Sequence, residues 1–272
     1  MYTSRMLLFL FACVLCALPA SAADSMQVVK TAPMSGRLMT VDELGNVYVV
    51  KQDNSLVRYT ETGDSSTSFR SVANGDIGAV DATNPLRVIV YYPAFSKVVV
   101  LDRMLALKNE INLSTIGILK PTVVATSADG NLWVYDQFNA RLRKIDDQLK
   151  EMAQNNDLRQ QIETVPNPSF MVERERRVYL CDTAQGIFTF DQYGNYINTL
   201  SVFGVKYLQV FGSQLVYRTG DSLNAFDLQT IRTAVLPLPP AGQVVNAALV
   251  RNTLYVLYAD KLVLYRIPEK QR

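Results

Sequence analysis

The feature that most constrains the fold of this chain is an internal repeat of paired short strands. Each copy has a β-branched or aromatic strand, a short turn, a second such strand and often an acid directly after it. One copy reads Gly130–Tyr135 followed by Arg141–Asp146, and the next reads Arg177–Cys181 followed by Gly186–Asp191. The anchors lie 41, 44, 46, 38 and 38 residues apart and are Tyr48, Ile89, Trp133, Tyr179, Tyr217 and Tyr255. A period near 40 residues with strands alone predicts a β-propeller with six blades.

The segments around each pair complete a four-stranded blade. Apolar stretches before the pairs, such as Leu38–Val41 and Val244–Ala247, are expected to form the innermost strands. Stretches after the pairs, such as Tyr196–Leu200, are expected to form the outer strands, since β-branched and aromatic residues favour strands. We therefore predict an all-β fold in one domain, 23–272, with blades at about 36–71, 76–113, 120–163, 169–202, 206–238 and 243–267 plus 26–32.

Two segments decide how the ring ends. The sixth copy stops at Ile267 and lacks an outer strand, whereas Met26–Lys30 near the start is an unassigned strand. An open ring would expose a sheet edge that is prone to mispairing, so we predict that Met26–Lys30 closes the last blade. Asp147–Ile162 is the one plausible short helix, although an outer strand plus a loop is the favoured interpretation.

The first 22 residues have the features of a signal peptide. Arg5 supplies the positive charge, Met6–Leu18 form the apolar run, and Pro19–Ala22 supply small residues for cleavage after Ala22. The run is shorter than the ~20 residues that a membrane-spanning helix needs. We expect a cleaved, exported protein in the periplasm or on the periplasmic side of the outer membrane. A lipoprotein attached through Cys13 or Cys16 is the less favoured alternative.

The composition of the mature chain excludes several kinds of chemistry. Cleavage removes Arg5 and no acid, which leaves 26 basic residues (27 minus one) against 25 acidic ones. This balance gives no general attraction to nucleic acid. Of the three cysteines only Cys181 remains, so no internal disulfide is possible, and we interpret Cys181 as a small buried hydrophobe. The chain has no histidine, which rules out histidine-dependent nucleophiles and typical zinc sites.

The turn motifs resemble those of a known class of propellers. Asp42–Val49, with the order Asp-x-x-Gly-Asn-Val-Tyr-Val, and the similar Asp129–Val134 resemble NHL and TolB-like six-bladed propellers. This class includes lactonases, lyases and many non-catalytic scaffolds, so the resemblance leaves the function open. Asn84–Asp102 and Asn131–Asp147 also resemble stretches of small envelope propellers from bacteria with type IX secretion.

The acids have a structural and a functional interpretation. Four follow the third strand of a blade and are expected to cap the next turn: Asp102, Asp146, Asp191 and Asp227. The resemblance to calcium-dependent lactonases directs attention to acids of the inner strands, and the candidates are Asp42, Glu43, Asp81 and Glu173. Glu173 lies in the alternating charge run Glu173–Arg177, which we interpret as a solvated hairpin. No metal site and no cofactor are predicted.

Aromatic residues give the strongest prediction of a binding surface. Five of the turns between second and third strands are largely polar, whereas that of the second blade reads Tyr-Tyr-Pro-Ala-Phe-Ser. Exposed aromatic clusters are typical of recognition sites. The predicted partner-binding residues are Tyr91, Tyr92, Phe95, Phe138, Pro237 and Pro239. Coverage of the aromatic turn by a neighbouring loop remains an equal alternative.

We therefore expect a non-catalytic protein-interaction module, monomeric in itself, that contacts another envelope protein. A candidate partner is an outer-membrane translocon or assembly complex of the type IX kind. The alternatives are a calcium-dependent lactonase or lyase and a propeller that binds carbohydrate or peptide. We predict no catalytic residues, no nucleic-acid partner and no transmembrane segment in the mature chain.

Overall fold

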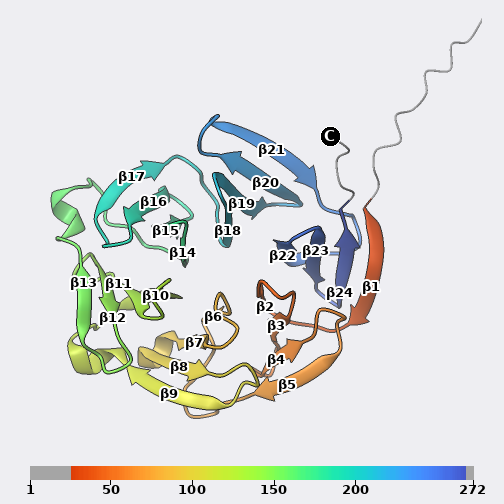
Figure 1. Cartoon of the computed structure of the whole chain (residues 1–272), viewed down its shortest axis with the longest axis horizontal. Coiled ribbons are helices and arrows are strands. Elements are labelled where there is room, and N and C mark those ends of the chain that lie inside the picture. The colour runs from red at the N-terminus through yellow and green to blue at the C-terminus, as the bar shows by residue number, and fades with distance from the viewer. Residues whose placement is uncertain (1–25, 268–272) are drawn as a thin grey trace, which may run out of the picture.

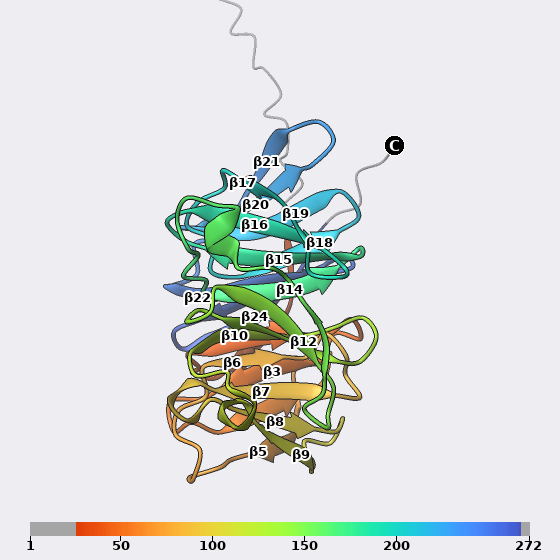
Figure 2. The ribbon, with the colours of Figure 1, turned by 90° about the vertical axis from the view of Figure 1, so that its left-hand side faces the viewer.

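Six antiparallel four-stranded sheets form a closed ring around a central channel in the computed structural model, which describes residues 26–267 (Figure 1). Figure 2 shows the same ring from the side. The fold is a six-bladed β-propeller, as the repeat predicts. Within each blade the strands run from the channel outwards in chain order, except that the last blade ends in β1.

The strands of the first three blades are as follows. Blade 1 has β2 (Leu38–Val41), β3 (Val47–Val50), β4 (Leu56–Tyr59) and β5 (Ser65–Phe69). Blade 2 has β6 (Ala79–Asp81), β7 (Val88–Tyr92), β8 (Lys97–Leu101) and β9 (Leu107–Asn112), with short 3-10 turns η1 (Pro93–Phe95) and η2 (Leu113–Ile116). Blade 3 has β10 (Pro121–Thr126), β11 (Leu132–Asp136), β12 (Arg141–Ile145) and β13 (Glu151–Gln154), followed by η3 (Leu158–Gln160).

The other three blades complete the ring. Blade 4 has β14 (Phe170–Arg174), β15 (Arg177–Asp182), β16 (Gly186–Asp191) and β17 (Tyr196–Leu200). Blade 5 has β18 (Leu208–Phe211), β19 (Gln214–Thr219), β20 (Ser222–Asp227) and β21 (Arg232–Pro237). Blade 6 has β22 (Val244–Val250), β23 (Thr253–Tyr258), β24 (Lys261–Arg266) and, as its outer strand, β1 (Gln27–Pro33).

The first described strand closes the ring, as predicted. β1 pairs antiparallel with β24 from Gln27 opposite Arg266 to Pro33 opposite Lys261, with a bulge between Val28 and Lys30. Lys30 also reaches the neighbouring blade 1, where its ammonium group lies 3.1 Å from a carboxylate oxygen of Asp64. The start and the end of the propeller are therefore joined within one sheet (Figure 1). The predicted signal peptide, residues 1–22, lies outside the described residues.

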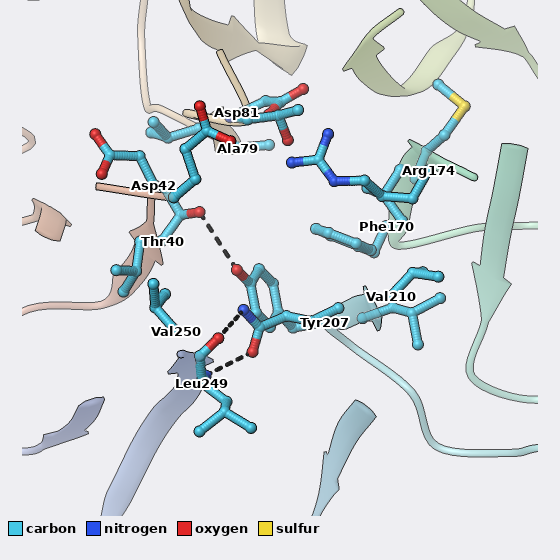
Figure 3. A pocket seen from close by; sticks show the side chains of 18 of the residues that line it. Thr40, Asp42, Ala79, Asp81, Phe170, Arg174, Tyr207, Val210, Leu249 and Val250 are labelled. Carbon is cyan, nitrogen blue, oxygen red and sulfur yellow. Dashed lines mark hydrogen bonds between the residues drawn. The ribbon is translucent and has the colours of Figure 1, made fainter. Parts of the chain in front are cut away.

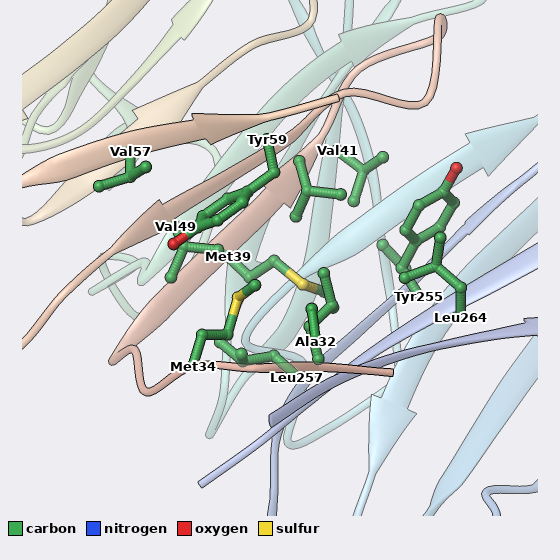
Figure 4. Packing of buried hydrophobic residues seen from close by; sticks show 13 residues of the cluster. Ala32, Met34, Met39, Val41, Val49, Val57, Tyr59, Tyr255, Leu257 and Leu264 are labelled. Carbon is green, nitrogen blue, oxygen red and sulfur yellow. The ribbon is translucent and has the colours of Figure 1, made fainter. Parts of the chain in front are cut away.

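The core consists of six apolar layers, one between each pair of neighbouring blades. The layer between blades 6 and 1 packs Met34 and Met39 against Val49 and Leu257 (Figure 4). In the layer between blades 3 and 4, Trp133 is fully buried beside Phe190. Because side chains of a strand alternate between the two faces of its sheet, each blade contributes to both of its neighbouring layers.

Acids after the third strands cap the following turns, as predicted. One carboxylate oxygen of Asp102 accepts hydrogen bonds from the backbone N–H groups of Met104 and Ala106, at 2.8 and 2.9 Å. Asp146, Asp191 and Asp227 accept two backbone N–H groups in the same way. These acids therefore stabilise the turns of the fold.

The favoured interpretation of Asp147–Ile162 is also confirmed, because the segment forms β13, a loop and the single turn η3.

The turns between second and third strands lie on the same side of the ring as the loops between blades. Backbone hydrogen bonds join the two sets, for example from Leu113 to the Ser96 carbonyl and from Gly204 to the Thr183 carbonyl. We call this side the loop face. The opposite face carries the turns between first and second strands and those between third and fourth strands. No helix among residues 26–267 is long and apolar enough to cross a membrane.

Candidate functional site

The structure corrects the predicted aromatic cluster at two of its three positions. Tyr91 and Tyr92 are the last residues of β7 and are buried, with 2% and 0% of their surfaces exposed. The turn begins only at Pro93, so both tyrosine rings point into the layers between blades. The Tyr91 hydroxyl donates a 2.6 Å hydrogen bond to the Pro121 carbonyl, and burial raises the pKa of Tyr92 to about 12. Neither residue is available to a partner.

Phe95 and Phe138, in contrast, are exposed on the loop face. Phe95 is 56% exposed at the tip of the blade 2 turn and lies against Gly75 of the preceding loop. Phe138 is 63% exposed in the blade 3 turn, whose backbone Asp136 caps. The sequence therefore identified two of the exposed rings of this face.

Three further apolar side chains of the loop face were missed. Val72, Leu119 and Phe203 are all exposed, and each lies in a loop between two blades. Together with Phe95 and Phe138 they form what we call the apolar set. These residues belong to no repeated strand, so only their place in inter-blade loops could have indicated them. Three of the four exposed phenylalanines among the described residues belong to this set, and the fourth, Phe211, lies on the opposite face.

The proline-rich segment Pro237–Pro239 is only partly exposed to solvent. Pro237 ends the outer strand β21 and is exposed. Leu238 is buried in the layer between blades 5 and 6. Pro239 is half-buried, and its carbonyl accepts a hydrogen bond from the Tyr258 hydroxyl. This segment therefore covers the core, and Pro237 alone of the two prolines presents much of its surface.

Two aromatic rings partition the central channel (Figure 3). Phe170 at the start of β14 and Tyr207 just before β18 pack edge to face, with ring centres 5.0 Å apart. The Tyr207 hydroxyl lies 3.4 Å from the Thr40 hydroxyl of β2 on the other side of the channel. Burial raises the pKa of Tyr207 above its ordinary value. These three residues line both of the cavities that open to the two faces.

The cavity on the opposite face is the larger, about 820 Å³, and carries mixed charge. Its charged lining residues are Asp42, Glu43, Asp81, Glu175, Arg174 and Arg251. The Arg174 side chain points into this cavity (Figure 3).

Two of the acids considered as calcium ligands, Asp42 and Asp81, are engaged in hydrogen bonds within the fold, whereas Glu43 is exposed. Asp42 is buried and accepts hydrogen bonds from the backbone of Leu44 and Asn46 and from the Tyr48 hydroxyl. Asp81 accepts the backbone N–H groups of Thr83 and Thr126. In residues 26–267, no group of three or more acidic or cysteine side chains is arranged to hold a metal ion.

The run Glu173–Arg177 forms the hairpin between β14 and β15 with an exposed tip, as predicted, but Glu173 itself is not solvated. It lies on the inner strand β14 and is only 4% exposed. Its carboxylate reaches across to blade 3, where it accepts hydrogen bonds from the Ser127 hydroxyl at 2.6 Å, the Ala128 N–H at 3.3 Å and the indole N–H of Trp133. Glu173 therefore joins two blades.

The cavity on the loop face has a volume of about 590 Å³ and is basic. Its charged lining residues are Arg37, Lys206 and Arg218, and no acid lines it. None of the three forms an ion pair with a described residue. The repeat pattern did not indicate this set, because the three cations come from separate segments that only the closed ring brings together.

Comparisons with known proteins identify the fold alone. No protein-family model and no curated protein match the chain. A catalytically inactive histidine-to-alanine variant of virginiamycin B lyase from Staphylococcus aureus, solved with quinupristin, is similar with a TM-score of 0.57 and 12% identity over 92% of this chain and 83% of that chain. BamB from Moraxella catarrhalis is similar with a TM-score of 0.53 and 11% identity over 91% and 99%.

A third similar structure is BBS1N in complex with ARL6DN, with a TM-score of 0.57 and 11% identity over 90% of this chain and 97% of that chain. Identities this low leave the family of the chain open. The likeness extends over nearly the whole chain and supports its description as a β-propeller, and the count of six blades comes from its own sheets.

Proposed function

We propose that this chain is a non-catalytic propeller that binds a partner protein through its loop face. The observation that carries the proposal is the apolar set, Val72, Phe95, Leu119, Phe138 and Phe203, exposed on that face. Aromatic side chains at the centre of an interface supply much of its binding energy, whereas exposed in water they cost solubility. BBS1N, a similar propeller, was solved in a complex with another protein, which supports a binding role.

The sequence argues against an enzyme of the lyase type. The similar virginiamycin B lyase was solved as a catalytically inactive variant in which alanine replaces a histidine. This chain contains no histidine, so it has no equivalent group. A calcium-dependent reaction also lacks support, because Asp42 and Asp81 are committed to backbone N–H groups.

We also propose that the protein acts in the cell envelope. The signal-peptide pattern of residues 1–22 supports export to the periplasm or to the periplasmic side of the outer membrane. The resemblance to small envelope propellers from bacteria with type IX secretion supports a role as an accessory of an outer-membrane export or assembly machine. The partner is then another envelope protein.

Affinity capture from detergent-solubilised membranes tests the binding role. Phe95→Ser with Phe138→Ser is expected to abolish capture of the partner, because each lost aromatic anchor costs about 2 kcal/mol or more. Both rings are exposed, so the double variant should unfold at the temperature of the parent protein. Phe211→Ser on the opposite face is the matched control. Equal capture by the double variant and the control would refute the proposal.

A further inference from the structure

The loop-face cavity differs from the other cavity in the sign of its charge. Arg37, Lys206 and Arg218 line it with no acid among its lining residues, whereas four acids and two arginines line the opposite-face cavity. A concave site lined by charges of one sign concentrates the electrostatic field at its mouth. Anions are therefore attracted to the channel from the loop face.

The two arginines of this cavity are held in place by the fold. Arg37 donates a 2.7 Å hydrogen bond to the side-chain oxygen of Asn54, and Asn54 is itself bound to the backbone of Gly75 and Ile77. Arg218 donates to the carbonyls of Gly220 and Val245, so it joins blades 5 and 6. A guanidinium group has five N–H donors, and these contacts leave donors free at both residues.

Lys206 differs from the two arginines because the fold does not hold its side chain. It is exposed and makes no hydrogen bond with another described residue. The three cations belong to blade 1, blade 5 and the loop that leads into blade 5, so they occupy one half of the mouth. The other half is neutral and includes Gly78, Val80 and Phe170.

We propose that this cavity binds a carboxylate-bearing segment of the partner, a short acidic stretch of polypeptide inserted from the loop face. The inference rests on the proposed function and names the chemistry of the partner. The volume of about 590 Å³ is in the range of pockets that enclose a drug-sized ligand, well beyond one small anion. Three cations without an acidic partner, on the same face as the apolar set, complement an acidic segment with apolar neighbours.

Fluorescence anisotropy with a labelled hexaglutamate peptide tests the proposal on the purified protein. Hexaglutamine, an uncharged peptide of the same length, is the control. We expect hexaglutamate to bind and hexaglutamine not to bind. The binding of hexaglutamate should weaken as the salt concentration rises, because the electrostatic screening length falls from about 10 Å at 0.1 M to about 3 Å at 1 M. Lys206→Glu should weaken binding about tenfold, since it replaces an attraction with a repulsion.

Arg251→Glu is the matched control, because Arg251 is exposed and lines the opposite-face cavity. It should leave hexaglutamate binding unchanged. Lys206→Glu should also leave the thermal unfolding curve unchanged, because Lys206 has no partner in the described part of the chain. The proposal is overturned if hexaglutamate does not bind, if hexaglutamine binds equally well, or if Lys206→Glu has no effect.

Succinate, a free dicarboxylate, tests whether the cavity binds a small anion instead of an acidic peptide. Succinate binding that depends on Lys206, without hexaglutamate binding, would assign the cavity to a small anion and overturn the peptide proposal. The two proposals also fail separately. Loss of hexaglutamate binding leaves the capture experiment with Phe95→Ser and Phe138→Ser intact, and a failed capture experiment leaves hexaglutamate binding as a result in its own right.

Discussion

A disulfide between Thr31→Cys and Val263→Cys would join β1 covalently to β24. These residues are direct partners in the antiparallel ladder that closes the ring. Directly opposed residues in such a ladder have Cα atoms about 4.5 or 5.5 Å apart, and both distances lie within the range of disulfides. Val263→Cys removes little volume from the layer between blades 5 and 6. The native Cys181 is buried and should stay reduced.

The expected gain follows from the length of chain that the bond encloses. Positions 31 and 263 bracket about 230 residues, nearly the whole propeller, and chain-entropy arithmetic for such a loop gives about 5 kcal/mol. Engineered disulfides commonly deliver less, so we expect the free energy of unfolding to rise by about 2–5 kcal/mol. The reduced form of the same variant is the reference, because it contains both substitutions without the bond.

Guanidinium unfolding followed by the fluorescence of Trp133, the only tryptophan of the chain, measures this gain in the oxidised and reduced forms. A mobility shift on a non-reducing gel reports whether the bond forms within one molecule. Failure of the bond to form within one molecule under oxidising conditions would contradict the pairing of β1 with β24. A bond that forms without any gain in stability would refute the expected entropic gain.

Two further predictions concern buried groups. Glu173→Ala should lower the free energy of unfolding by about 3–5 kcal/mol, because it leaves the Ser127 hydroxyl and the Trp133 indole N–H without their acceptor. Urea unfolding measures this loss. A loss no larger than that of the control variant Glu173→Gln would contradict the prediction. Cys181 should resist thiol reagents at pH 8 in the folded protein and react in guanidinium. Burial raises the pKa of its thiol and excludes the reagent. Rapid labelling of the folded protein would contradict the buried position of Cys181.

The sequence predicted those parts of the fold that depend on local patterns. The caps at Asp102 and Asp227 were predictable because their partners lie within four residues. The closure by β1 was predictable because the last blade lacked a strand and a spare strand was present. Both inferences needed only the repeat and general rules of sheets.

Features that depend on contacts between blades were not predictable in the same way. Glu173 looked solvated because its charged neighbours follow in sequence, whereas its partners Ser127 and Trp133 lie 46 and 40 residues away in blade 3. Tyr91 and Tyr92 were assigned to the turn because strand ends cannot be located within a residue or two from a pattern alone. The basic cavity arises only because the closed ring brings Arg37 and Arg218 to the lining of one cavity.

Hydrogen–deuterium exchange of the protein with and without its captured partner tests the central claim most directly. Binding through the loop face predicts slower exchange in the segments that carry the apolar set, 70–78, 93–96, 117–120, 137–140 and 201–207. The turns of the opposite face, including 42–46 and 192–195, should exchange at the same rate in both samples. Protection confined to those turns, with the loop-face segments unchanged, would contradict the account.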